Sequence, residues 1–427
     1  MRVRSDEMRK IAESFCLSLI LSAAACHDQS SRSQSVPEPQ LEQEVISNQA
    51  WQLRLIDDMG FDDPDNIGVG RITAHGEHLY LGTWNGQYGA KMYRSGDGEN
   101  WELMGSGSFS GNPNDFVVVS IAMFQGMLYV GTWNQEDGAA MFRTNPAAED
   151  AAAITWERIT SNGFGNPRNT GFTHMREFNG HLYAGCFNYA EGSEVWRSET
   201  GEPGSWKMVI PKGWNSDGNT DSTVMLVHDN YLYIGTESAR SKLISGAQLW
   251  RTDGQLAPPY DQWEKVNIDG FGNPANHNIC GLGELNGQIY AGTWNETQGL
   301  EVWRATPSES VPFGDWEQVN RNGFGNSDYT LTSSMAGLDG TLFLSGFKWQ
   351  GGLADIYTLP EFEPGTPADS VFAKSSDGMT WDIITRKGFM ERPMVGVMWL
   401  EAYNGKIFVG GHGQGVPMQL WVYEPVR

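Results

Sequence analysis

Basic residues and cysteine are scarce in this chain of 427 residues, and both scarcities limit what it can be. Lys and Arg together number 29 against 52 Asp and Glu, which gives a formal net charge of −23. A surface this negative repels phosphate backbones, so we expect no nucleic-acid partner. Of the four cysteines, only Cys186 and Cys280 lie outside the N-terminal leader described below. They fall in different repeats, so we expect two buried free thiols rather than a disulfide or a metal site.

The signatures of nucleotide and zinc chemistry are also absent. No Gly-x-Gly-x-x-Gly opens a helix, and the sequence has no P-loop, no His-Glu-x-x-His and no Cys-x-x-Cys. We therefore predict no cofactor and no metal site. The acidic run Asp57-Asp58 and Asp62-Asp63-Pro64-Asp65 offers oxygen ligands that could bind Ca²⁺. It lacks EF-hand spacing, and a solvated acidic loop is the alternative.

No long apolar run follows the N-terminal region, and the run from Phe15 to Leu21 is too short to span a bilayer as a helix. Basic residues precede this run and small residues follow it, which predicts a secretory signal peptide over residues 1–26. Residues 27–49 are rich in Ser, Gln, Glu and Pro and predict a flexible tether. Residues 50–427 are left for the folded domain.

The end of the leader, Ala23-Ala24-Ala25-Cys26, resembles a bacterial lipobox. The resemblance implies that Cys26 is acylated after cleavage and anchors the protein to the cell envelope. Ala23 stands where a lipobox usually has Leu, and secretion without a lipid is the alternative. In both cases we expect an extracytoplasmic protein with no membrane contact other than that anchor.

Glycine and tryptophan are abundant, with 52 and 17 residues, and both follow an internal repeat. An aromatic strand of the form Leu-Tyr-x-Gly recurs, usually after a pair such as Asn179-Gly180 that tolerates the positive φ angles of a tight hairpin. A third strand follows each copy, and a fourth strand opens with Trp. The recurring second strands end at Gly82, Gly131, Gly185, Gly235, Gly292, Gly346 and Gly410.

These repeats predict an all-β fold, a seven-bladed β-propeller with four antiparallel strands in each blade. The seventh Trp of the outer strands is Trp51, at the start of the folded region. The strand from Trp51 is therefore expected to complete the last blade and close the ring, which hides two open sheet edges. We expect a monomer.

Two turns between third and fourth strands, Ser95–Trp101 and Ser375–Trp381, read Ser-x-Asp-Gly-x-x-Trp. They resemble Asp boxes, the BNR-like repeats of the Asp-box and kelch-like β-propeller superfamily, although they are one residue short of the full pattern. The resemblance implies a propeller in which Asp97 and Asp377 satisfy backbone groups of the turn, and it implies no activity. Sialidases carry Asp boxes, but the pattern of their Arg triad near an early Arg-Ile-Pro motif is absent here. Arg71-Ile72-Thr73 matches only the first two residues of that motif.

Aromatic residues followed by Asn recur after the second strand, where the loops of a propeller open around its axis. An aromatic face can stack on the C–H face of a sugar while the amide binds its hydroxyls. We therefore predict ligand contacts there, with packing between blades as the alternative. The candidate ligand-binding residues are Trp84, Asn85, Trp133, Asn134, Asn188, Trp214, Trp294, Asn295, Lys348 and Trp349.

Departures from the repeat are the better catalytic candidates, because structure repeats around a ring whereas a catalytic site is usually unique. The fourth repeat has Glu237-Ser238 in place of Trp-Asn, and the seventh has His412. Such residues supply an acid or base and a cation for an anionic group, with sequence drift as the alternative. The candidate catalytic residues are Glu237, His277, Tyr329, Arg392 and His412.

Three functions are compatible with this pattern. The leading one is an exported, lipid-anchored propeller that binds a carbohydrate or another polar extracellular ligand on one face. The second is an enzyme on that face, either a polysaccharide lyase with His or Tyr as base, or a glycoside hydrolase that pairs Glu237 with Asp221 or Asp217. The third is a protein-interaction scaffold at the cell surface.

Overall fold

The chain separates into two compact units, Met1–Gln43 and Glu44–Arg427, and every described residue belongs to the second. The structure, a computed structural model, describes residues 51–426 apart from 217, 240–244, 258, 349–369, 387–393 and 414–415. No helix within these ranges has the length and apolar content needed to cross a membrane. The predicted leader and tether lie outside the described residues, and so do Cys26, Asp217, Trp349 and Arg392.

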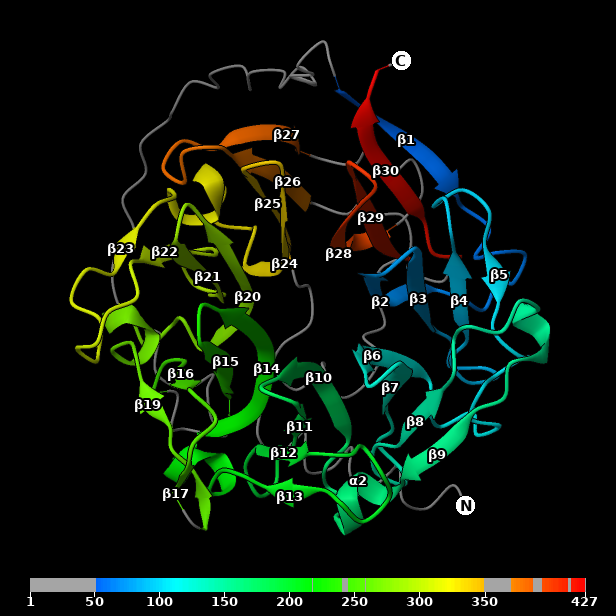
Figure 1. The fold of residues 1–427 in the computed structure, drawn as a ribbon. Coiled ribbons are helices and arrows are strands. Elements are labelled where there is room, and N and C mark those ends of the chain that lie inside the picture. Colours follow the sequence, from blue (N-terminus) through cyan, green and yellow to red (C-terminus); the bar gives the residue numbers. More distant parts are fainter. Residues whose placement is uncertain are drawn as a thin grey trace, which may run out of the picture. The chain divides into compact units, whose positions relative to one another are not determined.

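The second unit consists of antiparallel strands arranged in sets of four along the chain (Figure 1). Three sets come first: β2 (Gly68–His75), β3 (His78–Trp84), β4 (Met92–Ser95) and β5 (Glu102–Leu103); β6 (Val117–Phe124), β7 (Met127–Trp133), β8 (Met141–Thr144) and β9 (Glu157–Thr160); and β10 (Gly171–Phe178), β11 (His181–Phe187), β12 (Glu194–Ser198) and β13 (Lys207–Met208).

The later sets repeat the same order. They are β14 (Asn219–His228), β15 (Tyr231–Ser238), β16 (Leu249–Thr252) and β19 (Glu264–Lys265); β20 (Asn278–Leu285), β21 (Gln288–Trp294), β22 (Val302–Ala305) and β23 (Glu317–Gln318); β24 (Leu331–Leu338), β25 (Thr341–Phe347), β26 (Ser370–Ser375) and β27 (Asp382–Arg386); and β28 (Met394–Tyr403), β29 (Lys406–Gly413) and β30 (Leu420–Pro425) with β1 (Trp51–Asp57). A small hairpin of β17 (Leu256–Ala257) and β18 (Tyr260–Asp261) lies outside the sets.

The hairpins between first and second strands have the predicted turn chemistry. Asn179 and Gly180 have φ angles of 48° and 73°, and Asn404 and Gly405 have 49° and 70°. These left-handed conformations match the twist of the flanking strands and are accessible to Asn and Gly at little strain. The turn residues therefore fix where each first strand ends and each second strand begins.

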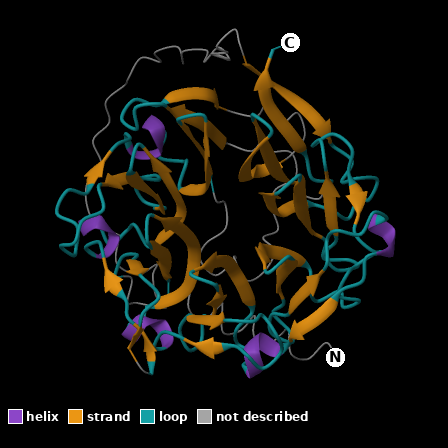
Figure 2. Cartoon of the chain, viewed as in Figure 1, coloured by secondary structure: helices purple, strands orange, loops and turns teal. Residues whose placement is uncertain are grey.

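The linkers between sets contain short helical turns that the strand periodicity did not predict (Figure 2). Within them a Gly–aromatic pair adopts left-handed angles, for example Gly163 at φ 55° and Phe164 at φ 60°. Each turn has at most four residues, which is too short to produce a helical period in the sequence. They are α2 (Asn162–Gly165), η2 (Lys212–Asn215), η3 (Asp269–Gly272) and η4 (Asn322–Gly325), with η1 (Ala151–Ala153) in an outer loop.

The first strands lie nearest the axis of the unit, and neighbouring ones lie side by side (Figure 1). Hydrogen bonding links the described strands into one sheet that contains β1 to β13 and β28 to β30 and another that contains β14 to β16 and β19 to β27, and neither closes on itself. Between them, β10 lies against β14 and β24 against β28. The fold is therefore all-β and of propeller type, as predicted, while the count of seven blades and the closure of the ring stay predictions.

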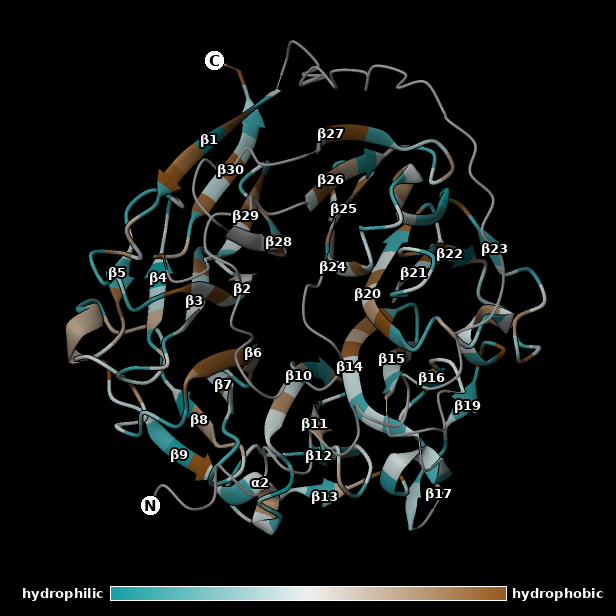
Figure 3. Ribbon diagram, turned by 180° about the vertical axis from the view of Figure 1, so that it is seen from behind, coloured by the Kyte–Doolittle hydropathy of each residue, from teal (hydrophilic) through white to brown (hydrophobic). Residues whose placement is uncertain are grey.

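The hydrophobic core lies between adjacent sets. One cluster joins Tyr80 and Met92 of the first set to Val118 and Leu128 of the second. The second strands are buried along almost their whole length because a neighbouring set covers each face. Figure 3 shows the resulting contrast between the hydrophobic inner strand β6 and the outer strand β9, which is largely hydrophilic.

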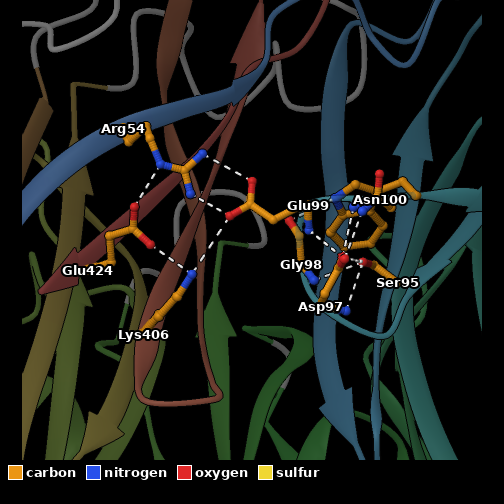
Figure 4. Close-up of polar contacts among 9 residues, drawn as sticks. Arg54, Ser95, Asp97, Gly98, Glu99, Asn100, Lys406 and Glu424 are labelled. Carbon is orange, nitrogen blue, oxygen red and sulfur yellow. Dashed lines mark hydrogen bonds and ion pairs between the residues drawn. The ribbon is translucent and has the colours of Figure 1, made fainter. Parts of the chain in front are cut away.

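β1 pairs antiparallel with β30, so the first and last described strands of the chain are adjacent. Trp51 stacks on Tyr423 with ring centroids 5.1 Å apart. Arg54 Nε donates to Glu424 Oε1 at 2.7 Å, and the same guanidinium also bonds Glu99 in the turn after β4 (Figure 4). These contacts join the two ends of the described chain to the first strand set.

The two turns that resemble Asp boxes hold their backbone through the predicted side chains. Asp97 Oδ1 accepts hydrogen bonds from the amides of Glu99 and Asn100, both at 2.8 Å, and Ser95 Oγ accepts one from Gly98 (Figure 4). Asp377 makes the equivalent bonds in the later turn. These bonds hold the pKa of both carboxyls well below the usual range, so each side chain stays ionised and serves the turn.

The glycine of the first of these turns packs against an aromatic residue of another set, which gives a direct test of this packing. A Cβ on Gly98 would lie 2.2 Å from Phe408 Cζ, and Gly98 has a φ of 79°. Gly76 has a φ of 57° but no atom within 4 Å of its Cβ position. We expect Gly98→Ala to lower the free energy of unfolding by about 3 kcal/mol, from backbone strain plus overpacking, and Gly76→Ala by about 1 kcal/mol from strain alone. Urea unfolding of both variants measures the difference, and equal losses would contradict the contact.

Candidate functional site

One position at the end of each second strand is aromatic in most sets, and the candidate site lies where the fourth set departs from this pattern. Each of these residues pairs with the beginning of the first strand of its own set, as Trp84 does with Gly68. The fourth set places Glu237 there, opposite Asp221. The residues at this position are Trp84, Trp133, Phe187, Glu237, Trp294, Phe347 and His412.

Asp221 and Glu237 form a nearly buried carboxyl pair on the first and second strands of the fourth set. Asp221 lies in β14 and is 6% exposed, and Glu237 lies in β15 and is 3% exposed. Thr173 Oγ1 of β10 donates to Asp221 Oδ1 at 2.7 Å, and Thr220 Oγ1 donates to Glu237 Oε2 at 3.0 Å. The two carboxyls come from directly opposed residues of adjacent strands, so they face the same side of the sheet.

Burial raises the pKa of both carboxyls toward neutrality. Loss of hydration raises the pKa of Asp221 to about 7, and the Thr173 hydroxyl opposes this rise. The pKa of Glu237 rises to about 8, chiefly through burial and further through the negative charge of Asp221. Two carboxyls that repel each other in this way share protons and titrate as a pair. The pair therefore holds at least one proton at neutral pH.

His277 is the predicted catalytic residue that the structure brings next to this pair. Its carbonyl accepts a hydrogen bond from the Ser238 amide at 2.6 Å, and the following residue, Asn278, pairs with Glu237. Its ring lies 4.9 Å from the ring of Trp294, and neither ring nitrogen has a hydrogen-bond partner. Burial lowers the pKa of His277 to about 4, so the imidazole is neutral at physiological pH.

The structure places the other predicted catalytic residues elsewhere. His412 is buried against Trp84, with ring centroids 4.2 Å apart, and burial lowers its pKa to about 3. Tyr329 is buried in the hydrophobic cluster that includes Leu300 and Phe324. Arg392 lies outside the described residues. Among the predicted catalytic residues that the structure describes, only Glu237 and His277 are thus shown to meet.

The predicted Trp–Asn contacts have a structural role in the described chain. Asn85, Asn134, Asn188 and Asn295 are buried, and their amides bond neighbouring loops. Asn295 is representative, because it donates to Asn276 Oδ1 at 2.9 Å and accepts from the amide of Gln298. These bonds support the packing alternative, and ligand contact by these side chains stays a prediction.

The other predicted ligand residues that the structure describes also have partners within the protein. Trp214 is buried and stacks on Trp250, with ring centroids 5.1 Å apart. Lys348 forms an ion pair with Asp328 at 3.2 Å. Trp133 and Trp84 keep part of their rings exposed, whereas Trp294 is buried. Trp349 and the alternative acid Asp217 lie outside the described residues.

The acidic run near β1 is occupied by turn and ion-pair contacts. Asp57 Oδ2 accepts from the amides of Met59 and Phe61, and Asp63 forms an ion pair with Lys91. Within the part of the chain that the structure describes, no group of three His, Cys, Asp or Glu is placed to hold a metal ion. Cys186 and Cys280 are both free thiols, but only Cys186 is buried as predicted, whereas Cys280 is half-buried.

A second polar cluster, which the sequence analysis missed, lies on three inner strands. Arg71 of β2, His174 of β10 and Trp399 of β28 occupy the same position of the repeat, each opposite the Gly near the end of its second strand. Arg176 and Glu401 follow two residues later on β10 and β28. The signal that could have found them is a charged or aromatic residue at an inner-strand position that holds Ser, Val or Gly in the other sets.

Comparison with known proteins supports the fold and gives no family. No protein-family model matches the chain, and no curated protein matches it. Among solved structures it resembles an ancestral GH74 enzyme, with 13% sequence identity and a TM-score of 0.55 over 85% of this chain and 48% of the other. It also resembles a mutant puromycin hydrolase, with 10% identity and a TM-score of 0.50 over 81% of this chain and 50% of the other. The chain thus spans about half the length of these two proteins, and at such low identity the likeness shows the fold alone.

Proposed function

We propose that the chain is a carbohydrate-active propeller that hydrolyses a glycosidic bond at the end of the inner strands where Asp221 and Glu237 lie. The observation that carries this proposal is the paired carboxyls, one of which stands at a position that most other sets fill with an aromatic residue. The likeness in fold to an ancestral GH74 enzyme supports the choice of substrate class. The proposal selects the hydrolase among the three functions that the sequence left open.

The pair has the chemistry that glycoside hydrolysis requires. Directly opposed residues on antiparallel strands have Cβ atoms about 5 Å apart. Attachment points this close allow the carboxyl separation of about 5–5.5 Å that a retaining mechanism uses, and we propose that mechanism. Glu237 keeps its proton to the higher pH and would protonate the leaving oxygen, while Asp221 would attack the anomeric carbon.

The finer architecture belongs to the same proposal. We propose a closed ring of seven blades in which β1 completes the blade of β28, β29 and β30. Support comes from the β1–β30 pairing and from contacts of β2 with β28 and β29. We also propose export through the predicted leader, anchorage through Cys26, and a monomeric state without a cofactor or a bound Ca²⁺.

The proposal is tested by a screen of polysaccharides for binding and degradation, followed by variants of the pair. We expect Glu237→Gln to lower kcat by a factor of about 10²–10⁴, because the amide cannot donate the proton that a general acid supplies. Asp221→Asn should cause a comparable loss, since the amide is a poor nucleophile. Glu136→Gln is the matched control, because Glu136 is an exposed carboxylate in the loop that follows β7, the second strand of another set.

The outcomes separate the functions. Full turnover in Glu237→Gln would show that the pair is structural and that the proposed mechanism is wrong. Binding without turnover, unchanged in Glu237→Gln, would favour the binding protein, for which the exposed parts of Trp84 and Trp133 are the specific support. If no glycan is bound or degraded, the carbohydrate proposal fails as a whole.

A further inference from the structure

The cluster on β2, β10 and β28 contains an excess of hydrogen-bond donors. The amide of Met225 donates to His174 Nδ1 at 2.8 Å. A neutral imidazole that accepts at Nδ1 carries its proton on Nε2. Arg71 Nη2 lies 2.5 Å from this same Nε2, so two N–H groups face each other with no acceptor between them.

Two further donors of the cluster are buried without a partner. Arg71 Nε is one, and the indole Nε1 of Trp399 is the other. The Arg71 guanidinium lies over the Trp399 ring, 4.2 Å from its centroid, so both donors belong to one small region. Buried donors without acceptors destabilise a fold by about 1–3 kcal/mol each, and an acceptor that entered this region would remove that penalty.

The charges of the cluster also favour a negatively charged acceptor. Burial lowers the pKa of Arg71 to about 10, and the nearby positive charge of Arg176 lowers it further. Glu401 is the carboxyl that faces both arginines, and one of its oxygens already accepts from the Ala74 amide at 3.0 Å. Two guanidinium groups against one carboxyl leave the cluster with a net positive charge, although the whole chain carries −23.

We infer that Arg71, His174 and Arg176 form an oxyanion-binding site between the inner strands, which takes a carboxylate or a sulfate group. Each guanidinium would donate charge-assisted hydrogen bonds to the anion, and the His174 Nε2–H would donate a third. Arg71 and Glu401 are half-buried, His174 is buried and Arg176 is exposed, so solvent reaches the cluster at Arg176. None of its residues belongs to the carboxyl pair, although Thr173, which bonds Asp221, directly precedes His174 on β10. Its occupation does not depend on any turnover.

The test is isothermal titration calorimetry on the full chain at low ionic strength. The probes are sodium glucuronate, sodium sulfate and neutral glucose. We expect an anion to bind and glucose not to bind. Binding of glucuronate alone would assign a planar carboxylate, whereas binding of sulfate as well would assign a general oxyanion site. No binding of either anion would overturn the inference.

Variants then locate the binding. Arg71→Gln and Arg176→Gln should each lower the affinity for the anion at least tenfold, because each removes a charge-assisted contact. Glu401→Gln should raise the affinity for the anion severalfold, because a competing negative charge is removed. A gain of affinity cannot result from misfolding. Arg168→Gln is the matched control, because Arg168 is an exposed arginine paired with Glu191 elsewhere. Unchanged affinity in both arginine variants would overturn the site.

A final comparison keeps this inference distinct from the proposed hydrolase. Glu237→Gln should bind the small anion as the parent does, even if it loses all glycan turnover. An anion that still binds in a chain without glycan activity would support the site and reject the proposed function. Loss of anion binding in Glu237→Gln would instead place the anion at the carboxyl pair and overturn the separate site.

Discussion

Raising the pH from 5 to 9 should lower the free energy of unfolding by roughly 6 kcal/mol through the Asp221–Glu237 pair. Both carboxyls have a higher pKa in the folded protein than in the unfolded chain, where Asp and Glu keep values near 3.8 and 4.5. The folded state therefore binds more protons than the unfolded chain between about pH 4 and pH 8. The stabilisation is complete below pH 4 and is lost as the pH rises through 7 and 8.

Urea unfolding at a series of pH values measures this slope, and variants of the pair assign it. In Glu237→Gln no second carboxyl has to ionise inside the blade, so we expect a flatter profile and a higher stability than the parent at pH 9. Asp221→Asn should act in the same way. The exposed control Glu136→Gln should keep the parent slope. A parental slope in both pair variants would contradict the raised pKa values and remove the main support for a proton donor at Glu237.

Repetition made most of the fold predictable from the sequence. The Leu-Tyr-x-Gly strands appear as β3, β7, β11 and their counterparts, and the Asn-Gly turns have the positive φ angles that hairpins need. Trp51 identified β1 as the partner of the last strand. The helical turns of the linkers were missed because their Gly–aromatic pairs adopt left-handed angles that leave no periodic trace.

The site was predictable only where it departs from the repeat. Glu237 and its possible partner Asp221 were found because a carboxyl replaces an aromatic residue, and their opposed register then brings them together. The Trp–Asn pairs repeat around the unit, and their Asn side chains form hydrogen bonds between loops, so repetition alone cannot distinguish a ligand surface from packing. The members of the Arg71 cluster lie on strands about 100 and 330 residues apart, so the repeat can mark each one as a departure but does not show that they meet.

Removal of β1 should have the largest effect on stability, because this strand joins both ends of the proposed ring. Its loss would expose the backbone edge of β30 and remove the Trp51–Tyr423 stack and the packing of Leu53. The ion pairs of Arg54 with Glu424 and Glu99 would also be lost. We expect a loss of about 5 kcal/mol or more from buried apolar surface alone, and aggregation through the open edge.

Point variants separate the ring contact from simple shortening of the chain. The double variant Trp51→Ala/Leu53→Ala keeps the strand but removes two half-buried side chains that pack on the core, so we expect a loss of about 3 kcal/mol and a lower Tm. Leu55→Ala lies on the same strand, but Leu55 is 37% exposed and should change stability by less than about 1 kcal/mol. Differential scanning calorimetry and light scattering measure both effects. Among the described strands, β30 pairs only with β29 and β1, so loss of β1 leaves one edge of β30 open. If the chain without β1 nevertheless unfolds at the parent Tm and stays monodisperse, the strand is dispensable and the proposed closure of the ring through β1 must be abandoned.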